Sequence, residues 1–282
     1  MLSKTLRSQT HFLKHQRRAF GIDHSMPCIF KDVKNHGYLP STKPMLELPQ
    51  QFSAMNQILD DMTIIQKNGT DGLLLRNKLR ETVDKELPNY MDELAKTDPA
   101  DERLNAALFR DYSMLSAAYL LEPCHINYLD TKEYGVALDY LPESIAQPMK
   151  FAADRIRYGQ LLLEYGYGYA LNNWKLKDDK NPENIEYNND QLYPGEGAPI
   201  TSNLELIRKF HGSESEAGFV LIHVVIDSKT HLLTAAHEKM FEGAKRKRLA
   251  VVSGSGTPLA TNLSFWPLRA LGTSKIGFLG EK

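Results

Sequence analysis

The chain contains only two cysteines among its 282 residues, Cys28 and Cys124. Two cysteines so far apart match neither the spacing of a zinc site nor a disulfide framework. The His-Glu-x-x-His motif of zinc enzymes and the Gly-x-Ser-x-Gly motif of serine hydrolases are also absent. The sequence therefore predicts no metal site built from protein ligands, and a reducing compartment is the simpler interpretation.

The chain also lacks a strong net charge and a long uninterrupted apolar run. Its formal net charge is −1, so no overall attraction to nucleic acid or to an acidic membrane is expected. No stretch approaches the roughly 20 apolar residues that a transmembrane helix needs. With 42% hydrophobic and 24% charged residues, the composition is that of a globular protein with a sizeable core.

Acidic residues are missing from the N-terminus. Residues 1–20 contain five lysines and arginines, and the first acidic residue is Asp23. This composition is typical of an organellar transit peptide, which would place the protein in mitochondria. A disordered basic tail is the alternative. In either case residues 1–26 are expected to lie outside the folded part.

Helical periodicity dominates the remainder. Apolar residues recur at spacings of three and four, and no alternation of strand and helix appears, so we predict an all-α fold. The expected helices span residues 52–65, 74–88, 101–121, 145–158, 160–174, 203–210 and 213–240. Residues 124–140 and the polar run 175–190 are expected to be loops.

Residues 213–227, SESEAGFVLIHVVID, carry the most information. Ser213 can cap the first turn of a helix and Glu216 can reach back to it, as in a capping box. The apolar run behind this start is too hydrophobic for a surface helix, so the helix should lie inside a helical domain. His223 is the only strongly polar side chain in that run before Asp227.

Phe219 and His223 are four residues apart and therefore share one helix face. A ring and an imidazole directed together into an apolar interior could line a cofactor or substrate pocket. A core histidine bonded to a neighbour is the alternative. The glycines and tyrosines of residues 165–174, YGYGYALNNW, allow either a ligand or a second helix to approach closely.

Four blocks of sequence resemble the indoleamine 2,3-dioxygenase family. They are GYLPSTKPMLELPQQF at 37–52, LPESIAQP at 141–148, YALNNWKLKD at 169–178 and NLELIRKFHGSESEAGFVLIHVVID at 203–227. The blocks follow the family order at similar spacing over about two hundred residues. The resemblance implies a haem b dioxygenase that converts L-tryptophan, or a related indole, and O2 to N-formylkynurenine in the kynurenine pathway, in the cytoplasm.

The resemblance also implies roles for individual residues. Phe219 would pack on the substrate indole and contact haem. His223 would be a catalytic residue on the distal side of the haem, where it could bond to the indole N–H or to oxygen. Further substrate contacts would be Val220, Tyr169, Ala170 and, uncertain by one residue, Gly166.

The resemblance predicts a small helical domain at 27–211 and the start of a large haem-binding domain at 212–245. Residues 246–282 showed no resemblance. In this family the proximal haem-ligating histidine lies further along the chain, so we expect a truncated and impaired enzyme. Helices absent from this chain would cover the apolar face of 213–227, and its exposure would favour self-association. A haem-free binding or regulatory module with the same fold is the alternative.

Overall fold

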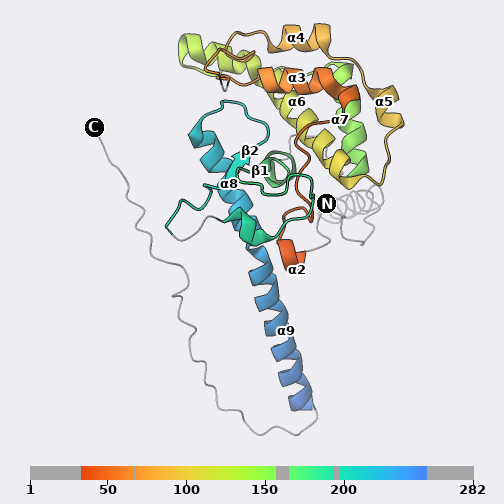
Figure 1. The fold of residues 1–282 in the computed structure, drawn as a ribbon, viewed down its shortest axis with the longest axis vertical. Helices are drawn as coiled ribbons and strands as arrows, with labels where there is room; N and C mark the ends of the chain where they lie inside the picture. The colour runs from red at the N-terminus through yellow and green to blue at the C-terminus, as the bar shows by residue number, and fades with distance from the viewer. Residues whose placement is uncertain (1–32, 67, 157–164, 194–196, 253–282) are drawn as a thin grey trace, which may run out of the picture. The chain divides into compact units, whose positions relative to one another are not determined.

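The computed structural model describes residues 33–66, 68–156, 165–193 and 197–252 (Figure 1). The chain divides into two compact units, Met1–Ala236 and His237–Lys282. The described part of the second unit is a single helical segment. The first unit is mostly helical, so the predicted all-α class is confirmed. The predicted boundary between residues 211 and 212 is untested and stays a prediction.

Helix α6, Glu102–Thr131, is the centre of the first unit. The Asp101 side chain caps it by accepting a hydrogen bond from the Leu104 amide at 2.9 Å. Figure 1 shows α3, α4, α5 and α7 gathered around it. These helices span Ser53–Asp61, Leu79–Glu86, Met91–Ala95 and Glu143–Arg155; the shorter α2 and η2 span Val33–His36 and Gln50–Phe52. The apolar faces of α3 to α7, with Phe52 of η2, form one continuous hydrophobic core.

The prediction of a loop from residue 124 is wrong, because α6 continues through Pro123 to Thr131. Proline removes one backbone donor, but packing outweighs that loss. Glu122, which is 1% exposed, accepts hydrogen bonds from the backbone amides of Leu79 and Arg80 and so ties α6 to the start of α4. The helix ends at Lys132, whose left-handed φ of 66° terminates it.

A small antiparallel sheet was not predicted. Strands β1, Trp174–Leu176, and β2, Leu204–Leu206, pair in register, with Trp174 opposite Leu206. The helix predicted at 203–210 is therefore wrong, because Leu204–Leu206 is a strand. The helix predicted at 160–174 is wrong at its last residue, Trp174, where β1 begins. Each strand is only three residues long and buries alternate side chains, a pattern too short for periodicity to separate from a helix. Residues Tyr165–Leu171 form a π-helix, η3, and Asn189–Leu192 form a short 3-10 helix, η4.

The helix predicted over 213–240 is present as two helices. Helix α8 spans Glu214–Ser228, and α9 spans Thr230–Val252, with Lys229 between them. By length and composition alone, the helical segment Glu214–Arg246 could cross a membrane. The sequence does not show this as an uninterrupted apolar run. One side of α8 is buried against the rest of the first unit, as is also found for core helices of soluble proteins.

Candidate functional site on helix α8

The N-terminus of α8 is fixed by one carboxylate, that of Glu216. It accepts hydrogen bonds from the backbone amides of Phe210, His211 and Gly212 at 2.7, 3.0 and 2.8 Å, and from the Tyr169 hydroxyl at 2.8 Å. The predicted Ser213 cap is confirmed, since its hydroxyl accepts from the Glu216 amide at 3.3 Å. The predicted return bond to Ser213 is wrong. The carboxylate instead accepts hydrogen bonds from the three backbone amides that precede Ser213. The chain turns there at Gly212, which has a positive φ of 84°.

The C-terminus of α8 is fixed by the segment before η2 and by η4. The Tyr38 amide donates to the Asp227 carbonyl at 3.1 Å, and the Asn189 side chain donates to the Ser228 carbonyl at 3.1 Å. Gly37 has a positive φ of 65°, and a Cβ there would lie 2.1 Å from the Asp227 oxygen. Only glycine fits this contact, so both ends of α8 are held rigidly within the first unit.

One side of α8 is buried. Val220, Leu221, Val224 and Val225 are at most 3% exposed and pack against the side chains of β1, β2 and η3. Burying four such side chains contributes roughly 1.5–3 kcal/mol each. The face opposite is therefore presented in one fixed orientation.

The other side of α8 carries large apolar side chains in contact with solvent. Phe219 is 63% exposed and Ile226 is 57% exposed; on α9, Leu232 and Leu233 are 59% and 65% exposed. Exposed apolar side chains in such a group mark a surface that binds something. The expectation from hydrophobicity, that 213–227 lies inside a helical domain, is therefore wrong for this face. The described residues leave the face exposed, as the resemblance predicted.

His223 lies on this face beside Phe219, as the four-residue spacing predicted. The two ring centroids are 5.4 Å apart with an interplanar angle of 70°. The His223 Nδ1 lies 2.8 Å from the Phe219 carbonyl oxygen. A carbonyl only accepts, so Nδ1 carries the proton in this contact, and in the neutral ring Nε2 is the accepting nitrogen. Burial raises the pKa of Asp227, and the charge of His223 opposes that rise.

The remaining predicted site residues lie on or next to η3 and α8. Tyr169 packs on Phe210, with ring centroids 5.4 Å apart, and its hydroxyl reaches Glu216. Ala170 and Val220 are 1% and 0% exposed and belong to the buried cluster, while Gly166 is partly exposed. The structure brings η3 and α8 together. The substrate contacts assigned to these residues stay predictions.

A buried ionic network was missed. Asp111 is fully buried between two arginines: its carboxylate accepts from Arg110 Nε at 2.6 Å and from Arg208 Nη2 at 3.2 Å. Arg208 also binds Asp60 at 2.6 Å and so joins the end of β2 to α3 and α6. Burial alone would raise the pKa of Asp111, but the two guanidinium charges outweigh it and lower the pKa. The adjacent Arg and Asp in an otherwise apolar helical run were the signal for this network.

A porphyrin needs a broad apolar wall, and its iron needs an axial ligand. The exposed apolar side chains on α8, with the His223 imidazole among them, fit one such wall. In the described part of the chain, no three His, Cys, Asp or Glu side chains cluster as a protein-only metal site would require.

The match to known families agrees with the blocks quoted above. Residues 30–263 match the family described as indoleamine 2,3-dioxygenase. The match includes residues 246–263, where those blocks gave no resemblance. The comparison with individual curated proteins gave no match. The chain belongs to the indoleamine 2,3-dioxygenase family, the haem dioxygenases of tryptophan catabolism.

Proposed function

We propose that this chain binds haem b against the exposed face of α8 and that the site takes L-tryptophan and O2 to form N-formylkynurenine. The observation that carries the proposal is the grouping of Phe219 and His223 on a rigid helix whose ends are fixed by Glu216 and Gly37. When bound, haem would supply the redox-active iron at which dioxygen reacts.

The residues of the chain would orient the substrate. The Phe219 ring offers an exposed face on which an indole can stack. The His223 imidazole, held by its Nδ1 bond to the Phe219 carbonyl, offers Nε2 as the acceptor for the indole N–H. Tyr169 and Gly166 would shape the wall beside the substrate, and Ala170 and Val220 would support it from the buried cluster behind.

We further propose that this chain by itself has low activity. An oxygen-activating site works when water is excluded from it. Phe219 is 63% exposed, so among the described residues nothing encloses the face on which the indole would stack. The same exposure would favour self-association of the chain. We propose the cytoplasm as the location, from the family resemblance, with mitochondria as the alternative from the basic residues 1–20; residues 1–26 lie outside the described residues.

Measuring the affinity for tryptophan tests whether Phe219 and His223 contact the substrate. In the reduced, haem-loaded chain, the spectral change caused by tryptophan should saturate at roughly tenfold higher concentration in Phe219→Ala and His223→Ala. Both side chains are at the surface, so folding should be unaffected. His211→Ala, an exposed histidine outside this face, is the matched control and should match the wild type.

Three results would contradict the proposal. Equal tryptophan affinity in the wild type and both variants would remove Phe219 and His223 from the substrate site. Loss of the haem spectrum in His223→Ala alone would make His223 an iron ligand rather than a substrate contact. Absence of any haem spectrum would favour the haem-free binding module.

A further inference from the structure

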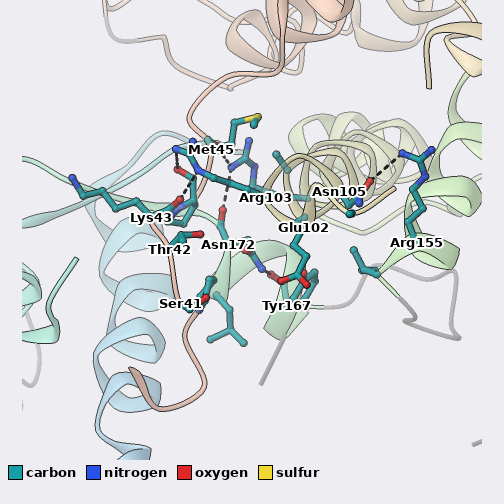
Figure 2. Close-up of a pocket in the computed structure, with 18 of the residues that line it drawn as sticks. Ser41, Thr42, Lys43, Met45, Glu102, Arg103, Asn105, Arg155, Tyr167 and Asn172 are labelled. Carbon is teal, nitrogen blue, oxygen red and sulfur yellow. Dashed lines mark hydrogen bonds between the residues drawn. The ribbon is translucent and has the colours of Figure 1, made fainter. Parts of the chain in front are cut away.

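A cavity of about 440 Å³ lies in the first unit, apart from the exposed face of α8. We call the segment 38–45 the strap; it forms one wall, and the opposite walls come from the start of α6, the end of α7 and the end of η3 (Figure 2). No residue of α8 lines it. Its volume is within the roughly 300–1,000 Å³ of small-molecule sites.

Two arginines of α6 hold the strap in place. Arg110 Nη1 donates to the Met45 carbonyl at 2.7 Å and to the Asn172 carbonyl at 3.1 Å, and Arg103 Nε donates to the Lys43 carbonyl at 2.8 Å. Lys43 is itself paired with Asp179 at 2.6 Å. The walls are therefore fixed before any ligand enters.

One guanidinium atom at this cavity is left unsatisfied. Arg110 is 0% exposed, and its Nη2 is buried with no hydrogen-bond partner among the described residues. A buried charged donor without an acceptor is unfavourable, and such atoms call for an explanation. The other donors of Arg110 are taken by Asp111, Met45 and Asn172. Because Arg110 lines the cavity, an acceptor bound there would complete the hydrogen bonds of its guanidinium.

The charged side chains around the cavity indicate which ligand group would bind to Arg110. Four cationic side chains line the cavity against one acidic side chain, Glu102; the four are Lys43, Arg103, Arg110 and Arg155. Arg155 is engaged with Thr97 and Asn105, and Lys43 with Asp179. A carboxylate matches the planar fork of Arg110 geometrically as well as in charge.

The rest of the lining is apolar, which favours an organic ligand over an inorganic ion. The apolar part comprises Pro40, Pro44, Met45, Pro99, Ala100, Ala106, Ala107, Ile156 and Leu171. Figure 2 shows Met45 above the space and Tyr167 at its lower edge. A compact hydrocarbon or aromatic body fits between such walls.

We propose that this cavity is a second binding site, which takes a small organic carboxylate on Arg110 Nη2. The site is separate from the exposed face of α8, and the proposal holds whether or not the chain binds haem.

The test uses the full chain with 4-fluorobenzoate as the probe, followed by fluorine NMR. The neutral analogue 4-fluorobenzyl alcohol is the charge control. Ala106→Leu fills the cavity without removing a charge, and Arg103→Met removes one cation from a partly exposed position. Ala95→Leu, at an exposed alanine of α5, is the matched control for the leucine substitution. Circular dichroism establishes that each variant is folded.

We expect 4-fluorobenzoate to bind at least about tenfold more tightly than the alcohol. Ala106→Leu should weaken probe binding by a similar factor, Arg103→Met should weaken it several-fold, and Ala95→Leu should leave it unchanged. Three outcomes would overturn the proposal: no probe binding at millimolar concentration, equal binding of acid and alcohol, or unchanged binding in folded Ala106→Leu.

Discussion

Replacing Asp111 by asparagine tests whether the buried ionic network holds the first unit together. The substitution keeps the shape of the side chain but removes the charge between Arg110 and Arg208. Both arginines are at most 3% exposed, so their charges cannot be rehydrated without opening the core. One amide oxygen can still accept from a single guanidinium, while the amide nitrogen would face donors.

The magnitude follows from the burial of the pair. Removing one partner of a buried, hydrogen-bonded ion pair costs about 3–5 kcal/mol, because an uncompensated charge is left behind. For a unit of this length that corresponds to a fall in melting temperature of roughly 6–20 °C.

Urea unfolding followed by circular dichroism measures the effect directly. The matched control is Asp154→Asn, the same chemical change at an exposed carboxylate paired with Lys150 on α7, and its stability should not differ measurably from the wild type. If Asp111→Asn and Asp154→Asn lose equally little stability, the network does not stabilise the fold as we describe.

The pH dependence has a definite sign. The pKa of Asp111 is lowered in the folded state, so its contribution is present above its ordinary pKa and is lost as pH falls through the lowered value. Wild-type stability should therefore decline below about pH 4. The difference between wild type and Asp111→Asn should narrow over the same range, and a constant difference would contradict the assignment.

Three further predictions concern the elements that support the α8 face. Gly72→Ala should unfold the protein or lower its stability strongly, because a Cβ would lie 1.5 Å from a backbone oxygen; Gly218→Ala, with open space around it in α8, should raise unfolding free energy by about 0.5–1 kcal/mol. Glu216→Ala should cost about 1–3 kcal/mol in urea unfolding and Glu214→Ala much less, since Glu216 alone accepts the three preceding amides. Ile226→Ser should reduce concentration-dependent association in sedimentation velocity, and unchanged association would exclude the exposed face of α8 as the contact.

The sequence was informative where a residue type has one dominant structural use. Ser213 as a helix cap and the shared face of Phe219 and His223 follow from local spacing alone, and the structure has both. The family blocks extended this to membership of the indoleamine 2,3-dioxygenase family, because they preserve order and spacing along the chain.

The rest depended on contacts between distant residues. The short strands β1 and β2 form because Trp174 and Leu206 meet across the sheet, which no local window contains. The helix predicted to end at residue 121 continues through Pro123, because the packing of α6 outweighs the loss of one backbone donor. The sequence shows Arg110 and Asp111 as a charged pair in an apolar run. Their partner Arg208 is 97 residues away from Asp111, so local spacing could not predict the contact.

The central claim is that the exposed face of α8 forms part of a haem site. Titration of the purified chain with haem, followed by the intensity of the Soret band, tests it most directly. We predict a band that saturates at one haem per chain and is lost when Phe219 is replaced by aspartate on the same face. A featureless titration, or an undiminished band in folded Phe219→Asp, would contradict the account.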